Sequence, residues 1–183
     1  MTGHHLILGE LDDLITGEIV KDTHDERYRQ KIARLLVDRK GYLKNDIEPR
    51  KSLRVKAGEN RAIIKIDFLI NLSDRLCMII KYGPGSLTTR HRPVLAASRL
   101  AAPYQIPVAV VTNGEDAEIL EGSSAKVLAR GLEMIPSKTE LYGMADRFDF
   151  NQIPAERAEM ESRILYCYEI DDSCPCDEDI CRI

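Results

Sequence analysis

Two neighbouring apolar runs constrain the fold of this chain most strongly. The first extends from Ala62 to Ile70 and alternates apolar with polar residues over much of its length, whereas the second extends from Leu76 to Tyr82 and is apolar on both sides until Lys81. These patterns predict two β-strands, of which the second is an inner strand of a sheet covered on both faces. A turn near Ser73 and Asp74 would join them. The residues expected to share one face of the first strand are Ile64, Ile66, Phe68 and Ile70.

A helix and a further strand are expected after these runs. Gly83-Pro84-Gly85 ends the second strand, and Pro93 suits the first turn of a helix. The alanine and leucine content of residues 94–102 predicts that helix. Residues 106–112 indicate another buried strand, and a hairpin turn then leads to a short partner strand at 117–120. The helix would therefore cross over the sheet to connect two of its strands.

Upstream of the apolar runs, the sequence predicts a helix and one more strand. Thr23 and Glu26 form a capping-box pattern, and apolar residues then recur at helical spacing until Gly41. The helix is expected over about residues 24–40, and the strand over residues 47–56. The elements then follow one another in the order αβββαββ.

The last third of the chain is expected to be mostly helical. Ser137 and Glu140 repeat the capping-box pattern, and Pro154 opens a second helical segment. We therefore expect one α/β domain over residues 1–150, with a C-terminal helix and a cysteine-rich acidic tail over residues 151–183 packing on it. The apolar residues at helical spacing in the second segment are Met160, Ile164 and Leu165.

Length and charge limit the classes of function. A chain of 183 residues fits one domain with a sizeable core. A net charge of −4 argues against a protein that coats nucleic acid by bulk electrostatics, so that any nucleic-acid contact must be local. The N-terminal sequence has neither a basic region nor an apolar run of the length that signal peptides and membrane spans need. We expect a cytoplasmic protein without a membrane partner.

Three residues are candidates for a metal-dependent reaction. Asp67 and Lys81 lie near the ends of two predicted adjacent strands, and Glu26 lies in the first turn of a helix that could pack across the sheet. Carboxylates hold hard divalent cations, and a neighbouring ammonium group can orient water and stabilise developing charge. Each residue also has an ordinary interpretation: Glu26 as a capping residue, Asp67 as the solvent side of a strand, Lys81 as a terminal charge. Asp25 is a second candidate for the helical acid.

Four short motifs carry a resemblance to a known family. They are Asp25-Glu26-Arg27-Tyr28-Arg29-Gln30, Ile66-Asp67-Phe68, Ile79-Ile80-Lys81 and Val111-Thr112-Asn113-Gly114. In their order and spacing they resemble the PD-(D/E)XK nucleases, and most closely the N-terminal nuclease domain of type I restriction enzyme R subunits. The resemblance covers about Thr23 to Leu120.

The resemblance implies a fold, an activity and partners. The implied fold of residues 1–150 is a restriction-endonuclease-like αβββαβ core, a mixed β-sheet flanked by helices. The activity is hydrolysis of nucleic acid, DNA more than RNA, with Mg²⁺ or Mn²⁺ as cofactor. Partners would be DNA and either a second copy of the chain or a separate restriction or motor subunit. The chain contains no G-x-x-x-x-G-K-[ST] loop, so ATP-driven translocation would need another polypeptide.

One position departs from the family pattern. The family carries a glutamate two residues before the lysine, and this chain has Ile79 there. Residues two apart on a strand share a face, so an expected metal ligand is missing beside Lys81. Glu48, on the preceding strand, is the best substitute, which gives a ligand set of Asp67, Glu26 and Glu48. Alternatively, the fold has lost catalysis and now serves as a nucleic-acid-binding or scaffold module.

A basic segment follows Lys81. Thr89, Arg90 and Arg92 supply hydroxyl and guanidinium donors that could bind phosphates beside the site. Ordinary surface residues are the alternative interpretation.

The C-terminal cysteines form the remaining motif. Four thiols close together could bind Zn²⁺ or an iron–sulfur cluster, although the spacing differs from the usual Cys-x-x-Cys pairs. A thiol tail without metal and a redox-sensing tail are the alternatives. The four residues are Cys167, Cys174, Cys176 and Cys181.

Overall fold

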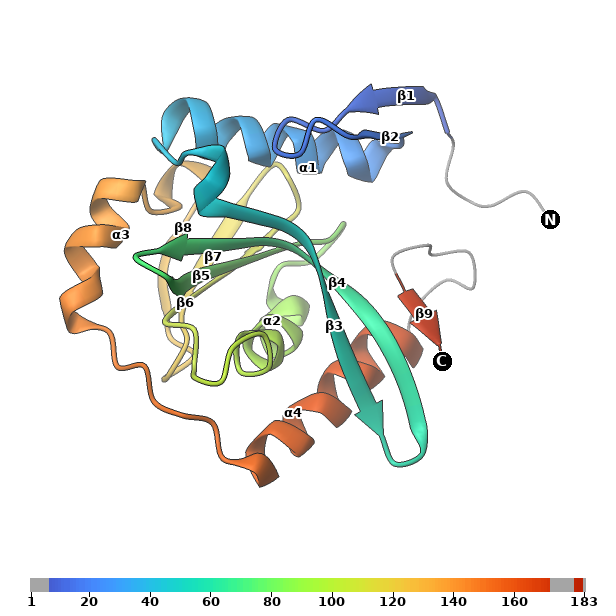
Figure 1. Ribbon diagram of the computed structural model, residues 1–183, viewed down its shortest axis with the longest axis vertical. Helices are drawn as coiled ribbons and strands as arrows, with labels where there is room; N and C mark the ends of the chain where they lie inside the picture. The colour runs from blue at the N-terminus through green and yellow to red at the C-terminus, as the bar shows by residue number, and fades with distance from the viewer. Residues whose placement is uncertain (1–6, 172–179, 183) are drawn as a thin grey trace.

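A computed structural model describes residues 7–171 and 180–182 of the chain, and it shows one sheet between two layers of helices (Figure 1). Helices α1 and α3 cover one face of the sheet, and α2 and α4 cover the other. The α-helices of the described residues are α1 (His24–Arg34), α2 (His91–Ser98), α3 (Lys138–Met144) and α4 (Ala155–Tyr166).

The sheet has the strand order β3-β4-β5-β6-β7-β8, with β9 beside β4. Strands β5 and β6 are parallel because α2 crosses over between them, and the other neighbours are antiparallel. The predicted mixed sheet flanked by helices is therefore confirmed. The strands are β3 (Ile47–Ala57), β4 (Asn60–Leu72), β5 (Arg75–Tyr82), β6 (Val108–Thr112), β7 (Ala117–Glu121), β8 (Val127–Arg130) and β9 (Ile180–Arg182).

Several elements lie outside the predicted order. A small antiparallel hairpin of β1 (Gly9–Asp12) and β2 (Ile19–Asp22) precedes α1, and β8 extends the far edge of the sheet. Short helical turns join the larger elements. These are η1 (Leu35–Arg39), η2 (Lys44–Asp46), η3 (Thr88–Arg90), η4 (Leu132–Met134), η5 (Ala145–Arg147) and η6 (Cys167–Asp171).

The first helix begins as predicted but uses its capping residues differently. Thr23 is the N-cap, and its Oγ1 accepts a hydrogen bond from the Glu26 amide at 3.1 Å. The reciprocal half of the box is absent among the contacts of Glu26, whose carboxylate instead accepts from Gln30 and Arg50. This carboxylate is therefore turned away from the cap and towards the sheet.

The apolar side chains of strand β4 do not all pack on the same face of the sheet. Ile64 and Ile66 pack in the cluster beneath α2 and α4, whereas Phe68 and Ile70 pack in the cluster beneath α1 and α3. The expectation of a shared face is wrong because the long β3–β4 hairpin twists and bends. The change of layer falls at Asp67.

Two further predictions need correction. The crossover helix was expected over residues 94–102 but is α2, His91–Ser98, so the basic segment belongs partly to the helix. Met160 on α4 is 49% exposed, whereas Leu165 is fully buried in the core. The helical phase of α4 therefore buries fewer apolar residues than the spacing indicated. No helix of the described residues is long and apolar enough to span a membrane.

Candidate functional site

Asp67 and Lys81 lie opposite each other where β4 separates from β5. Phe68 pairs with Ile80 in the antiparallel register, which places Asp67 across from Lys81 at the next position. The amide of Tyr82 donates to Asp67 Oδ2 at 2.8 Å, so the two strands still touch there. Beyond this point β5 pairs with β6, while β4 pairs with β3 and β9. Both candidates are buried, at 7% and 6% exposure.

Register also decides the side of the sheet to which these residues point. Leu69 and Ile79 are the pair two positions inward, and both lie in the cluster beneath α2 and α4. Side chains two residues apart on a strand point to the same side. Lys81 therefore points to the face that α2 and α4 cover, whereas Asp67 lies where β4 changes layer and contacts Arg29 of α1.

Arg29 from α1 reaches Asp67. Its Nε donates to Asp67 Oδ1 at 2.6 Å, and its Nη1 lies 3.8 Å from a carboxylate oxygen of Glu26. The guanidinium also lies over the ring of Tyr82, 5.4 Å from its centroid. Arg29 thus links the two acids that the sequence proposed as metal ligands.

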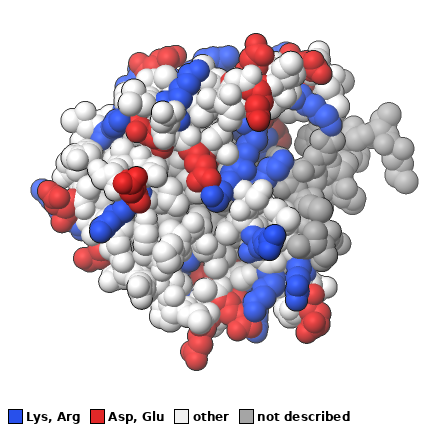
Figure 2. Space-filling model, in the orientation of Figure 1, with Lys and Arg blue, Asp and Glu red and all other residues white. Residues whose placement is uncertain are grey.

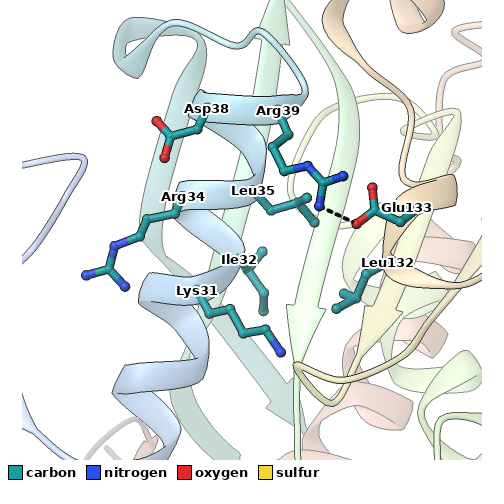
Figure 3. Close-up of a pocket in the computed structure, with 8 residues that line it drawn as sticks. All are labelled: Lys31, Ile32, Arg34, Leu35, Asp38, Arg39, Leu132 and Glu133. Carbon is teal, nitrogen blue, oxygen red and sulfur yellow. Dashed lines mark hydrogen bonds and ion pairs between the residues drawn. The ribbon is translucent and has the colours of Figure 1, made fainter.

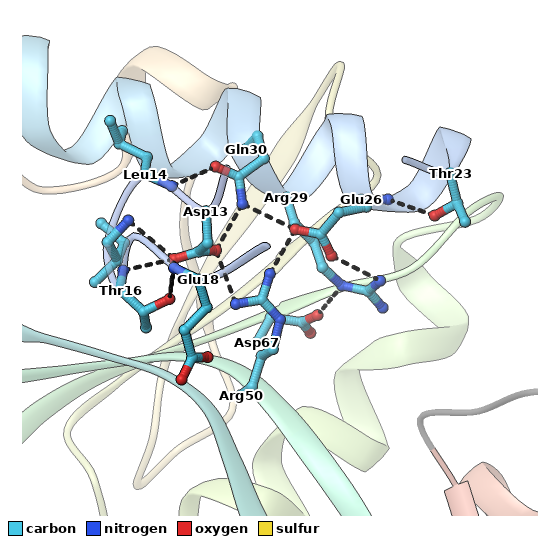
Figure 4. A network of polar contacts seen from close by, with 11 residues as sticks. Asp13, Leu14, Thr16, Glu18, Thr23, Glu26, Arg29, Gln30, Arg50 and Asp67 are labelled. Atoms are coloured by element: carbon cyan, nitrogen blue, oxygen red, sulfur yellow. Dashed lines mark hydrogen bonds and ion pairs between the residues drawn. The ribbon is translucent and has the colours of Figure 1, made fainter. Parts of the chain in front are cut away.

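A second arginine, Arg50, holds the other side of Glu26 (Figure 4). Arg50 lies 2.5 Å from Glu26 Oε1 and 2.8 Å from Asp13 Oδ2, and Gln30 donates to the same two oxygens at 2.8 and 2.7 Å. Burial raises the pKa of Asp13, but hydrogen bonds from the Thr16 amide and then from Arg50 and Gln30 outweigh it and lower that pKa to about 2. The Asp13 carboxylate is therefore held in its ionised form within this network.

Arg50 adopts an unusual backbone conformation on β3. Its φ is 51°, in the left-handed region that side chains with a Cβ rarely occupy. Pro49 pairs with Phe68 and Lys51 with Ile66, so Arg50 lies across from Asp67, at the place where β4 changes layer. Sequence reasoning missed both Arg50 and Asp13 because neither belongs to a recognisable motif.

Lys81 pairs with a residue that the sequence did not indicate. Its Nζ lies 2.8 Å from a carboxylate oxygen of Glu169 in η6, with both side chains largely buried at 7% and 16% exposure. Ile79 is completely buried among apolar residues. A carboxylate does therefore lie beside Lys81, but it comes from the C-terminal segment and not from position 79.

Two other candidate acids lie elsewhere. The Glu48 side chain is 44% exposed and forms an ion pair with Lys51 at 2.6 Å. Asp25 accepts a hydrogen bond from the Tyr82 hydroxyl at 3.0 Å, and burial together with this carboxylate raises the pKa of Tyr82. The structure therefore brings Glu26 and Asp67 together through Arg29, whereas Glu48 has a partner of its own.

The proposed phosphate-binding residues separate in space. Thr89 is exposed and donates to the Ser86 carbonyl at 3.0 Å. The Arg90 guanidinium folds over Gly83, where a Cβ would lie 2.3 Å from its Cζ, and donates to the Pro84 carbonyl. Arg90 and Thr89 therefore border the loop that follows Lys81.

Arg92 points away from that loop, into a buried ion-pair cluster. It lies 2.9 Å from a carboxylate oxygen of Glu161, which is fully buried on α4 and also contacts Arg99 and Arg157. Arg92 therefore helps to join α2 to α4, and its role with phosphate stays a prediction.

The cysteine motif lies mostly outside the described residues. Cys174 and Cys176 fall in the undescribed segment, as do the side-chain contacts of Cys181. Cys167 is an exposed free thiol in η6. Among the residues that the structure describes, no group of three or more histidine, cysteine, aspartate or glutamate side chains is arranged to hold a metal ion.

A pocket on the other side of α1 does not offer a better site (Figure 3). It has a volume of about 240 Å³, below the roughly 300 Å³ at which pockets for small molecules begin. Arg39 and Glu133 pair across it at 2.7 Å. The pocket is lined by Lys31, Ile32, Arg34, Leu35, Asp38, Arg39, Leu132 and Glu133.

Comparison with known proteins decides the family. The sequence model for the type I restriction enzyme R protein N terminus matches residues 24–136, more than half of the chain. The chain belongs to this family. The matched region of this R-protein N-terminal domain contains Glu26, Asp67 and Lys81, whereas Asp13 and Glu169 lie outside it. Searches of curated proteins and of solved structures found no match.

Proposed function

We propose that this R-protein N-terminal domain is a PD-(D/E)XK-type, Mg²⁺- or Mn²⁺-dependent hydrolase of nucleic-acid phosphodiesters, with DNA as the preferred substrate. One observation carries the proposal: Asp67 and Lys81 occupy opposite positions at the strand fork and are both buried. Burying charged groups costs free energy even when they are paired, as Asp67 is with Arg29 and Lys81 with Glu169, so an acid and a lysine together at such a place favour a chemical role. These 183 residues contain no G-x-x-x-x-G-K-[ST] loop, so cleavage coupled to translocation would draw on a motor outside them.

The carboxylates retain capacity for a cation. An ionised carboxylate offers about four acceptor sites, and Asp67 uses two, one for Arg29 and one for the Tyr82 amide. Mg²⁺ is commonly held by only one or two protein carboxylates, with water completing its shell. Asp67 would hold the cation, with Glu26 and Glu48 as further candidate ligands, and the bound cation would stabilise charge on the phosphate.

Lys81 would act on water and on the phosphate. In the hydrolysis the water oxygen forms a new bond to phosphorus, and one P–O ester bond breaks. One proton of the water passes to a base or to solvent, and the leaving oxygen takes up a proton, which yields a phosphate monoester and a hydroxyl group. The Lys81 ammonium, held at the fork, would orient the water and stabilise the negative charge of the transition state.

A local basic surface could guide nucleic acid to the fork. Basic side chains gather over the β3–β4 hairpin in Figure 2, although the chain as a whole is acidic. Four exposed residues of this hairpin are Lys51, Arg54, Lys56 and Arg61. Such a stripe binds the phosphate backbone without reading sequence.

A noncatalytic nucleic-acid-binding module is the second candidate. The observation that favours it is that Arg29 and Arg50 neutralise Asp67 and Glu26, while Ile79 occupies the family's glutamate position inside an apolar cluster. Binding through the basic hairpin would then persist without cleavage.

Cleavage assays distinguish the two candidates. Plasmid and single-stranded DNA are incubated with the protein and Mg²⁺ or Mn²⁺, beside Asp67→Asn and Lys81→Gln, with exposed Lys126→Gln as the charge control. If the domain is a hydrolase, we expect metal-dependent cutting that falls by about a hundredfold or more in the two site variants and persists in the control. DNA binding without cutting would support the noncatalytic module.

A further inference from the structure

We infer that Glu169 supplies the carboxylate that the family places two residues before the lysine, so that the metal site of this chain is completed from its C-terminal segment. The inference rests on the proposed function, because it completes the same site. The juxtaposition that carries it is the 2.8 Å contact between Lys81 Nζ and the Glu169 carboxylate.

The position of Ile79 explains why the acid has to come from elsewhere. Ile79 is fully buried and belongs to the apolar cluster that also contains Leu165 and Ile170. A glutamate at this position would place a charge inside that cluster, which costs several kcal/mol or forces protonation. The packing of the C-terminal helix on the sheet is therefore incompatible with the family's usual ligand position.

The same packing places another carboxylate, that of Glu169, beside Lys81. Leu165, Tyr166 and Ile170 anchor the end of α4 and η6 in the cluster, with Ile170 fully buried. Between them, Cys167 and Tyr168 face solvent, while Glu169 turns inward to Lys81. The π-helical geometry of η6 shifts the phase of the last turn, and such turns are frequent at functional sites.

Asp67 and Glu169 then flank one lysine from two directions. Asp67 lies across from Lys81 in the extended strand register and is held by Arg29 of α1, whereas Glu169 reaches Lys81 from η6. The side chain of Glu169 is 16% exposed, so its carboxylate borders both the buried lysine and solvent. Two carboxylates suffice for Mg²⁺ or Mn²⁺, which keep several waters. Glu169 lies outside the region that the family model matches.

The alternative is that Glu169 is only a structural partner of Lys81, and metal binding distinguishes the two roles. Isothermal titration with Mn²⁺ is carried out on the wild type, Glu169→Gln and the matched control Glu159→Gln. Glu159 lies on the same helix, is half exposed and pairs with Arg163. The inference predicts that Glu169→Gln weakens Mn²⁺ binding roughly tenfold or more, as expected for loss of a ligand, and that Glu159→Gln leaves it unchanged. A lower melting temperature in Glu169→Gln with unchanged Mn²⁺ affinity would overturn it.

A measurement on the wild type keeps the inference testable if Glu169→Gln folds poorly. Paramagnetic Mn²⁺ broadens amide resonances close to its site, so a titration followed by NMR should broaden Glu169 and Ile170 together with Asp67. Broadening at Asp67 without Glu169 would overturn the inference.

Cleavage of plasmid DNA by the same proteins separates the inference from the proposed function. Cutting by the wild type and not by Glu169→Gln supports both. Equal cutting by both proteins retains the proposed function and overturns the inference. If Mn²⁺ binding depends on Glu169 but no protein cuts DNA, the inference stands and the proposed hydrolase function is wrong.

Discussion

Arg29 Nε lies 2.6 Å from Asp67 Oδ1, so a guanidinium from α1 already occupies part of the carboxylate at the strand fork. The Arg29 side chain is 19% exposed and that of Asp67 is 8% exposed, so solvent screens this pair only in part. A cation approaching Asp67 would therefore be repelled by a positive charge at short range. The positive charge of Arg29 therefore offsets the negative charge of Asp67 at the fork.

This relationship predicts that removal of the Arg29 charge strengthens metal binding. Arg29→Gln should bind Mn²⁺ more tightly by about 1 kcal/mol, roughly fivefold, because the repulsion between the guanidinium and the cation is lost. Isothermal titration measures the change, with exposed Arg27→Gln as the control. Unchanged or weaker Mn²⁺ binding in Arg29→Gln would show that the cation does not use Asp67.

The fork itself could be predicted from the sequence because its origin is local. Apolar periodicity in residues 62–70 and 76–82, with a polar turn between them, specifies an antiparallel hairpin and sets Asp67 near Lys81. Both turn residues, Ser73 and Asp74, have positive φ, as hairpin turns require. Local sequence patterns of this kind are therefore sufficient to predict the fold class.

The partners of these residues could not be predicted because they depend on tertiary packing. The ion pairs of Glu169 with Lys81 and of Arg50 with Asp13 join segments far apart in the chain. No periodicity or motif marks them. The positive φ of Arg50 is equally invisible, since the sequence places an ordinary charged residue in an ordinary strand. Long-range ion pairs and local strain appear only when the strands have been placed.

Because the backbone at Arg50 is strained, we predict that glycine at this position gives a more stable protein than alanine does. Arg50→Gly and Arg50→Ala both lose the ion pairs, but only glycine adopts a φ of 51° without steric cost. Arg50→Gly should therefore be more stable than Arg50→Ala by about 1 kcal/mol. Chemical denaturation measures both.

Ser52 on the same strand provides the matched control. It lies in the regular register opposite Lys65, so Ser52→Gly should be less stable than Ser52→Ala by about 0.5–1 kcal/mol. If glycine and alanine rank in the same order at both positions, the strain at Arg50 does not exist.

The ionisation of Asp13 predicts a specific pH dependence of stability. Its pKa is lowered from 3.8 to about 2, so its contribution to stability is complete above pH 3.8 and is lost as the pH falls through about 2. The full contribution is about 2 kcal/mol.

Asp13→Asn removes this titration. Between pH 5 and pH 2, the unfolding free energy of the wild type should therefore fall more steeply than that of Asp13→Asn. Denaturant titrations at several pH values give both curves, and the other carboxylates contribute equally to each protein. Parallel curves would mean that Asp13 is not held ionised by Arg50 and Gln30.

The buried position of Ile79 predicts that restoring the family's glutamate does not improve the site. Ile79→Glu would place a carboxylate in a fully buried apolar cluster, so we expect a loss of about 3 kcal/mol or more in unfolding free energy. Leu128→Glu, at a strand position that is 47% exposed, is the control and should change stability by less than about 0.5 kcal/mol. Thermal and chemical unfolding measure both variants. A stable Ile79→Glu protein with tighter Mn²⁺ binding would mean instead that the apolar cluster opens to admit a carboxylate. Leu69 and Ile79 would then line the metal site and would not be part of the core.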